Sequence, residues 1–222
     1  MEYNTLHIDS IKKSFDNKNI LQDIYLKINS GDIVGLLGRN GSGKSTLLNI
    51  IFETLEAESK FIKINDKVYE KVYINKNVVN YLPQNDFLPK DLKVRSLINI
   101  CFKKSISKNI KNDEIIKKII NTKIRNISGG ELRYLEIKLL LNLESKFLLL
   151  DEPFNGVSPL LIEKIKKMIK ENSLNKGIIL TDHDYRNVLS VANRIHFLKD
   201  GSLIEIKNKI ELKKYGYIPD EN

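Results

Sequence analysis

Short apolar runs, turns and amphipathic stretches alternate along most of the chain. Residues 6–28 alternate apolar and polar side chains, which predicts two paired strands with one inward face. Residues 33–37 are apolar throughout, as in a strand buried on both faces, and a helix is expected to begin near Lys44. The expected inward positions of the paired strands are Ile8, Ile11, Phe15, Ile20, Leu21, Ile24, Leu26 and Ile28.

The remaining pattern predicts a second β-rich piece, a helical segment and a parallel α/β unit. Residues 61–83 have β-rich character, whereas residues 87–127 show helical spacing broken by lysine-rich linkers. From residue 130 onward helices and strands alternate, which is typical of a parallel sheet. The expected elements are helices at 131–143, 159–172 and 184–191, strands at 147–150 and 177–181, and a hairpin of strands 195–199 and 202–207 around Asp200-Gly201.

Composition and charge narrow the class of protein. With 222 residues, 41% of them hydrophobic and 29% charged, the chain fits one compact unit and not a disordered one. The 37 Lys and Arg exceed the 28 Asp and Glu by nine, which favours an anionic neighbour such as a phosphate-rich ligand, nucleic acid or a lipid surface. Its single cysteine, Cys101, is expected to be a small apolar core residue.

Membrane spans and a secretory leader are not expected. No apolar run approaches the roughly 18 to 20 residues that cross a bilayer. Polar residues Asn4, His7 and Asp9 interrupt the start of the chain, where a leader would be apolar. A cytoplasmic protein is therefore the expectation.

A glycine-rich loop follows the apolar run at 33–37. It matches G-x-x-x-x-G-K-[ST] between a buried strand and a helix, a placement that an ordinary glycine turn does not require. In such a loop backbone N–H groups surround phosphate oxygens, Lys44 reaches the β and γ phosphates, and Ser45 offers its hydroxyl to Mg²⁺. ATP and Mg²⁺ are thus the expected ligands of Gly38, Arg39, Asn40, Gly41, Ser42, Gly43, Lys44, Ser45 and Thr46.

Two carboxylates follow the apolar run at 147–150. A magnesium nucleotide site needs a carboxylate at the end of a neighbouring buried strand, and Asp151 occupies that position. Successive residues at a strand end point in different directions, so Asp151 and Glu152 take different roles. Asp151 is expected to hold the metal and its water shell, and Glu152 to polarise the attacking water as a general base.

The segment Ser128-Gly129-Gly130-Glu131 precedes the helix at 131–143 and lies upstream of Asp151. With it, the chain resembles the ATP-binding cassette (ABC) ATPases over essentially its whole length. The resemblance implies one α/β domain of the P-loop NTPase type over residues 1–222. Its ATP-binding core, with an antiparallel β subdomain, is expected at 1–84 and 128–222, and a small helical subdomain at 85–127.

The resemblance also implies roles for single residues. Gln84 is similar to the Q-loop glutamine that coordinates Mg²⁺ or the lytic water, and His183 to the switch histidine that contacts the γ-phosphate and holds Glu152. Phe15 occupies the place of an adenine-stacking aromatic. Taken singly, a glutamine before a loop is usually a solvated side chain and a histidine usually a satisfied surface or core residue, and Phe15 could simply cap the β-rich core. Residues 155–158 resemble the D-loop, with Ser158 where the family usually has Asp, so communication between two ATP sites is expected to differ.

The expected partners also follow from the family. Family members form ATP-dependent head-to-tail homodimers in which Ser128, Gly129, Gly130 and Glu131 of one chain would clamp ATP bound to the other, helped by unobstructed N–H groups at a helix N-terminus. Membrane subunits would dock at the Q-loop groove and the helical subdomain, with Phe87, Leu88 and Arg186 as candidate contacts. This places the chain at the inner face of the cell membrane, and no specific nucleic acid is expected.

The cargo is less constrained. Residues 151–157 and 180–186, together with Glu131, Glu136 and Leu189, resemble the ATPases of lipopolysaccharide export. Branched-chain amino-acid importers carry related versions of these segments. A non-transport cassette that remodels a soluble assembly, and a regulatory module that binds ATP without turnover, are the alternatives from other classes. The presence of Glu152, Gln84 and His183 argues against the regulatory module.

Overall fold

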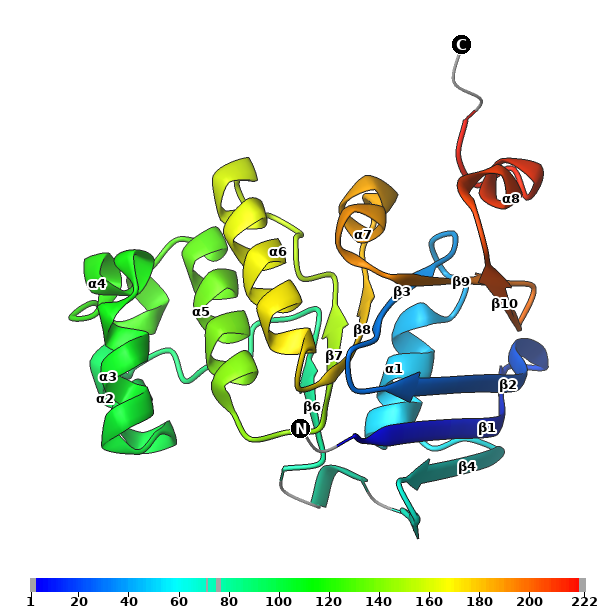
Figure 1. Ribbon diagram of the computed structural model, residues 1–222, viewed down its shortest axis with the longest axis horizontal. Coiled ribbons are helices and arrows are strands. Elements are labelled where there is room, and N and C mark those ends of the chain that lie inside the picture. Colours follow the sequence, from blue (N-terminus) through cyan, green and yellow to red (C-terminus); the bar gives the residue numbers. More distant parts are fainter. Residues whose placement is uncertain (1–2, 71, 75–76, 220–222) are drawn as a thin grey trace.

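Two β-sheets organise the chain (Figure 1), whose computed structural model describes residues 3–70, 72–74 and 77–219. One sheet has four strands in the order β2-β1-β4-β5, and the other has six in the order β10-β9-β3-β8-β7-β6. From β9 to β6 all neighbours in the larger sheet are parallel, and β10 joins β9 as an antiparallel hairpin. The predicted α/β class is confirmed.

The smaller sheet is formed by β1 (Thr5–Phe15), β2 (Lys18–Asn29), β4 (Ser59–Ile64) and β5 (Lys67–Val68). Of the expected inward positions, six are buried: Ile8, Ile11, Leu21, Ile24, Leu26 and Ile28. The prediction is wrong for Phe15, which is 44% exposed, whereas Ile20 is partly buried and packs against the core. Both flank the tight turn at Asp16 and Asn17, where the strands reach the nucleotide pocket described below.

The larger sheet consists of β3 (Ile33–Leu37), β6 (Val79–Leu82), β7 (Phe147–Asp151), β8 (Gly177–Thr181), β9 (Arg194–Lys199) and β10 (Ser202–Ile206). The predicted β-rich piece at 61–83 therefore does not form one unit. Strand β4 pairs with β1 in the smaller sheet, whereas β6 lies parallel to β7. Residues 71, 75 and 76 of that piece lie outside the described residues.

Four helices accompany the core: α1 (Lys44–Phe52), α5 (Gly129–Asn142), α6 (Pro159–Ser173) and α7 (Tyr185–Val191). Helices α2 (Val94–Cys101), α3 (Lys104–Asn112) and α4 (Glu114–Ile119) lie together at the end of the molecule opposite β10 (Figure 1). The predicted lysine-rich tail contains a further helix, α8 (Lys209–Lys214), capped by Asn208. Cys101 is exposed, so the prediction of a core position for it is wrong. In the part of the chain described, no helix has the length and apolar character of a membrane span.

The buried strands face two hydrophobic cores because successive side chains point to opposite faces. Ile33 and Leu37 pack with apolar residues of α5, α6 and α7, whereas Val34 and Leu36 pack with α1 and the antiparallel sheet. The buried apolar residues of α2, α3 and α4 belong to the first core. A strand with apolar residues on both faces, as predicted for residues 33–37, is thus confirmed.

His196 makes the stability of this core depend on pH. It lies buried on β9, and among the described residues its Nδ1 has no hydrogen-bond partner. Burial lowers the pKa of His196 from its ordinary 6.5 to about 4. The folded chain therefore keeps His196 neutral where the unfolded chain binds a proton, so stability is lost as the pH falls through the unfolded value.

Between about pH 7 and about pH 5 we expect His196 to lower the free energy of unfolding by about 2 kcal/mol. A His196→Phe variant lacks the titrating group and serves as the reference. Urea unfolding at both pH values measures how much the free energy of unfolding of each protein changes with pH. If both proteins lost the same free energy of unfolding between the two pH values, the role assigned to His196 would be contradicted.

Candidate ATP-binding and catalytic site

The glycine-rich loop connects β3 to α1 in a shape that requires glycine. Gly43 has φ +104°, and a Cβ there would lie 2.7 Å from Cγ2 of Ile20. Gly41 also has a positive φ, +77°. Gly43 is the N-cap of α1 and makes no side-chain capping bond, so the first N–H groups of the helix face the loop. Such an N-terminus attracts phosphate through its free N–H groups and the helix dipole.

The Lys44 side chain binds the backbone of the glycine-rich loop. Its side chain is buried, and its Nζ donates to the carbonyl oxygens of Gly38 at 2.8 Å and Arg39 at 3.2 Å. Burial lowers the pKa of Lys44, while the carboxylates of Glu152 and Asp151 oppose that shift. A buried ammonium at the start of α1, near these two carboxylates, is placed to bind phosphate oxygens.

Asp151, the last residue of β7, faces the first turn of α1. Its Oδ1 accepts a hydrogen bond from Ser45 Oγ at 3.1 Å, and its Oδ2 accepts one from Tyr81 Oη at 3.2 Å. Burial raises the pKa of Asp151, and these two bonds oppose the shift. A carboxylate beside a hydroxyl is an oxygen donor set that suits Mg²⁺, which binds through few protein ligands and substrate phosphates. The sequence did not point to Tyr81, although it lies three residues before Gln84.

Glu152 contacts the other two side chains that were predicted from the sequence to be catalytic. Its Oε1 lies 2.7 Å from His183 Nε2, and its Oε2 accepts from Gln84 Nε2 at 3.0 Å. Asn155 Nδ2 approaches the same Oε2 at 3.3 Å. Glu152 is buried and its backbone has φ +52°, while its N–H donates to Thr181 O at 2.9 Å. Three segments distant in sequence therefore meet at one carboxylate.

His183 also connects the catalytic carboxylate to the glycine-rich loop. Its Nδ1 lies 3.1 Å from Oδ1 of Asn40. One imidazole thus contacts Glu152 on one side and the loop on the other. The sequence named both His183 and Asn40 but not this contact between them.

These groups line one pocket of about 390 Å³ between the loop and the ends of the strands. Phe15 borders it with an exposed ring, and the Lys13 ammonium lies 4.9 Å from the centre of that ring. The lining residues are Phe15, Ile20, Asn40, Gly41, Gly43, Lys44, Ser45, Thr46, Gln84, Glu152 and His183. Catalytic and nucleotide-contacting candidates from five separate segments are therefore brought together.

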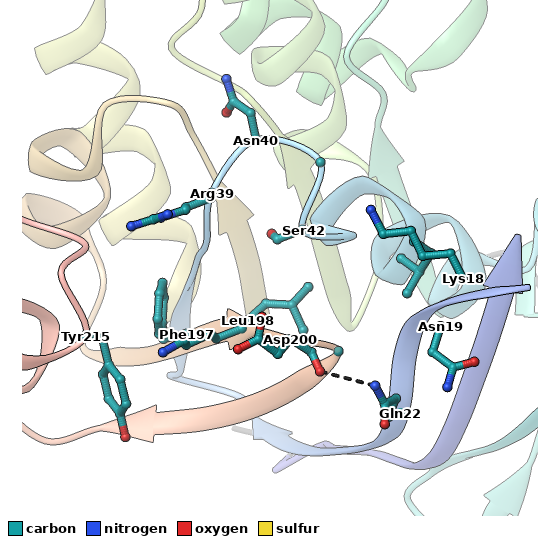
Figure 2. Close-up of a pocket in the computed structure, with 14 residues that line it drawn as sticks. Lys18, Asn19, Gln22, Arg39, Asn40, Ser42, Phe197, Leu198, Asp200 and Tyr215 are labelled. Atoms are coloured by element: carbon teal, nitrogen blue, oxygen red, sulfur yellow. Dashed lines mark hydrogen bonds between the residues drawn. The ribbon is translucent and has the colours of Figure 1, made fainter.

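Arg39 and Ser42 are not brought into that pocket. Both line a second hollow of about 560 Å³, which Figure 2 shows between the loop and the hairpin at Asp200. Arg39 Nη2 points toward Gly216 O at 3.5 Å. The two hollows share Ile20, Asn40 and Gly41, so the loop separates them. Nucleotide contacts of Arg39 and Ser42 therefore stay a prediction.

The segment from Ser128 to Glu131 starts α5 and does not line the pocket of its own chain. It forms a capping box: Ser128 Oγ accepts from the Glu131 N–H at 3.3 Å, and Glu131 Oε2 accepts from the Ser128 N–H at 3.1 Å and from Ser128 Oγ at 2.7 Å. The expectation of unobstructed N–H groups at this helix start is therefore wrong for Glu131, because its N–H is bonded to Ser128. Gly129 leaves the outer side of the turn open, since a Cβ there would meet nothing within 4 Å, whereas a Cβ at Gly130 would lie 3.4 Å from Gly156 O.

A glycine-rich loop on a parallel sheet, with Ser45 and Asp151 adjacent and Glu152, Gln84 and His183 in contact, defines a P-loop ATPase. Residues 21–155 match the family model of the ABC transporter family. The chain belongs to this family, and it is an ATPase of the ABC type.

Known relatives and solved structures agree with that assignment. The lipopolysaccharide export system ATP-binding protein LptB of Escherichia coli (strain K12) is 30% identical, covering 90% of this chain and 89% of that protein. LptB of Haemophilus influenzae is 32% identical over 90% and 88% of the two chains. An ATP-binding subunit of an ABC transporter superposes with a TM-score of 0.82 at 19% identity, covering 96% and 93% of the chains. A nucleotide-free ATP-binding cassette from an ABC transporter superposes with a TM-score of 0.77 at 21% identity, covering 97% of this chain and 96% of that chain. These two structures support the fold.

Proposed function

We propose that this chain is the ATP-hydrolysing subunit of a transporter that moves lipopolysaccharide or a related envelope lipid through separate membrane subunits. The observation that supports ATP hydrolysis is that Gln84 and His183 both contact Glu152 in the pocket that Lys44 also lines. The cargo rests on the likeness to LptB proteins over nine-tenths of the chain.

Each pocket residue has a distinct role in this proposal. Lys44 and the N–H groups of the loop bind the β and γ phosphates, and Ser45 with Asp151 holds Mg²⁺. The ion would neutralise charge on the phosphate oxygens. Glu152 accepts a proton from the attacking water, and His183 keeps the carboxylate oriented from Oε1. Gln84 contacts Glu152 Oε2 and orients the water once Mg²⁺-ATP is in place.

Two chains are proposed to complete each site. Ser128, Gly129, Gly130 and Glu131 do not line the pocket of their own chain, so their proposed contact with the γ-phosphate requires a second copy. The Ser128–Glu131 capping box would open as the phosphate takes over its N–H partner. Dimerisation then depends on ATP, which neutralises and bridges the facing surfaces.

Membrane subunits are proposed to dock beside Gln84. Phe87 is 45% exposed there, whereas Leu88 is buried, so Leu88 is withdrawn as a contact. Arg186 is exposed and pairs with Asp184 at 2.9 Å. Residues 86–127 carry eleven basic and four acidic side chains, which suits a position at the inner face of an anionic membrane. The chain would then be peripheral to the membrane.

Phe15 is proposed to stack on adenine. Base stacking on an aromatic ring contributes about 1–3 kcal/mol, so Phe15→Ala is expected to weaken ATP binding about tenfold and Phe15→Tyr to preserve it. Phe61→Ala removes a similarly exposed ring from the same sheet away from the pocket and serves as the control. Titration with a fluorescent ATP analogue measures the three affinities. Equal affinities of Phe15→Ala and Phe61→Ala would contradict the role.

Co-purification tests the transport proposal. A Glu152→Gln variant, which should hold ATP without turnover, is purified in detergent from its native cell, and co-purifying proteins are identified by mass spectrometry. Integral membrane proteins of lipid export are the expected partners, and a Glu152→Gln, Phe87→Asp variant should lose them. Amino-acid permeases would favour an importer instead. Only soluble partners would favour a non-transport cassette.

A further inference from the structure

Arg133 and Glu136 form a buried ion pair within the first turns of α5. Arg133 is 5% exposed and Glu136 is fully buried, and Arg133 Nη1 lies 3.2 Å from Glu136 Oε2. Burial raises the pKa of Glu136, while the Phe87 N–H and Arg133 oppose the shift. A buried ion pair contributes little net stability compared with apolar side chains of similar volume. The contacts that the pair makes to other segments are therefore the more informative feature.

Arg133 bridges two segments that carry catalytic candidates. Its Nη1 donates to Pro83 O at 2.8 Å, in the residue just before Gln84. Its Nη2 donates to Asp151 O at 2.6 Å and to Glu152 O at 3.1 Å. The planar guanidinium presents several N–H groups in fixed directions, so one side chain sets the spacing between these backbones. The Asp151–Glu152 turn that Arg133 binds is also where Glu152 has a positive φ.

Glu136 binds the backbone on the C-terminal side of Gln84. While Oε2 faces Arg133, Oε1 accepts the backbone N–H of Phe87 at 3.1 Å. The pair therefore fixes the backbone at Pro83 and at Phe87, and Gln84 lies between these two points. The side chain of Gln84 then reaches Glu152 at 3.0 Å.

We propose that the Arg133–Glu136 pair is a positioning device that keeps the Gln84 segment and the Asp151–Glu152 turn in register for hydrolysis. Neither side chain lines the nucleotide pocket, so both act through the backbones they hold. The same pair connects Phe87, the exposed residue at the proposed docking surface, to the catalytic turn. This inference rests on the roles proposed for Glu152 and Gln84.

Three variants test the device through the turnover number. Arg133→Lys keeps the charge but loses the forked bridge, and Glu136→Gln keeps the shape but loses the ion pair. The double variant Arg133→Met, Glu136→Met fills the buried volume with apolar side chains and leaves no unpaired charge, so it preserves the fold. Each is expected to lower kcat about 10-fold to 100-fold, with KM and ATP affinity within about twofold of the parent, because misplacement of catalytic groups acts mainly on the chemical step.

A matched control lies on the same helix. Lys138 Nζ pairs with Asp113 at 2.9 Å and ties α5 to the helical segment without touching Gln84 or Glu152. Lys138→Met is expected to lower the melting temperature and to leave kcat unchanged. Hydrogen exchange should increase at residues 84–88 and 152–155 in the pair variants and not in this control.

The outcomes separate this inference from the proposed function. If the double variant melts near the parental temperature, binds ATP and keeps parental kcat, the positioning role is overturned. A kcat loss in Lys138→Met equal to that of the pair variants would also overturn it, because a general structural effect would then suffice. If Glu152→Gln retains parental turnover, the catalytic assignment itself fails, whatever the pair variants do.

Discussion

We expect Glu152→Gln to lower ATP hydrolysis about 1000-fold and to leave ATP binding intact. The amide has nearly the shape of the carboxylate and still offers an oxygen to the donors around it, but it cannot accept the proton of the attacking water. Loss of a general base typically costs 10²- to 10⁴-fold, so we expect kcat to fall about 1000-fold. Phosphate release at saturating Mg²⁺-ATP measures the turnover, and equilibrium titration measures the affinity.

A second glutamate to glutamine change provides the control for that result. Glu171 lies on α6 with an exposed side chain, away from the nucleotide pocket. Glu171→Gln should hydrolyse ATP at the parental rate. Turnover of Glu152→Gln within a few-fold of this control would remove Glu152 from the role of base.

We expect Lys44→Ala to remove most ATP binding. The variant loses the cation that the structure holds buried beside Asp151 and Glu152, and with it the charge-assisted contacts to phosphate oxygens. Hydrogen bonds to charged groups contribute about 1.5–3 kcal/mol, which corresponds to a loss of affinity of about 10-fold to 100-fold. Calorimetric titration with ATP measures the change.

The control for Lys44 is a lysine of the smaller sheet. Lys63 lies on β4 outside the pocket, and Lys63→Ala makes the same change in net charge. Its ATP affinity should match that of the parent. If Lys44→Ala and Lys63→Ala bind ATP equally well, the loop does not cradle phosphates as proposed.

The parts of the fold that sequence predicts best are those where one residue pattern has one physical solution. Strands at Ile33–Leu37 and Gly177–Thr181 have the bounds predicted, because a short apolar run between polar turns fits only a strand buried on both faces. The loop with Lys44 and the carboxylates at the end of β7 were also located from local pattern. Sheet membership was not: the four residues of β6 give no local sign that they pair with β7 and not with β4.

The contacts within the site depend on tertiary structure that local pattern does not contain. Arg133 acts on backbone carbonyls of Pro83, Asp151 and Glu152, and backbone acceptors have no sequence signature. Similarly, the bond from Tyr81 to Asp151 requires that β6 and β7 be neighbours. The capping box of Ser128 and Glu131 is the exception, since its spacing is visible in the sequence.

The mass of Glu152→Gln in solution tests the central claim, that two chains enclose ATP and hydrolyse it, most directly. Light scattering after gel filtration would be recorded without nucleotide, with Mg²⁺-ATP and with Mg²⁺-ADP. We predict the mass of one chain without nucleotide and with ADP, and a doubled mass with ATP. The mass of a single chain at saturating ATP, or an unchanged dimer in all three conditions, would contradict the account.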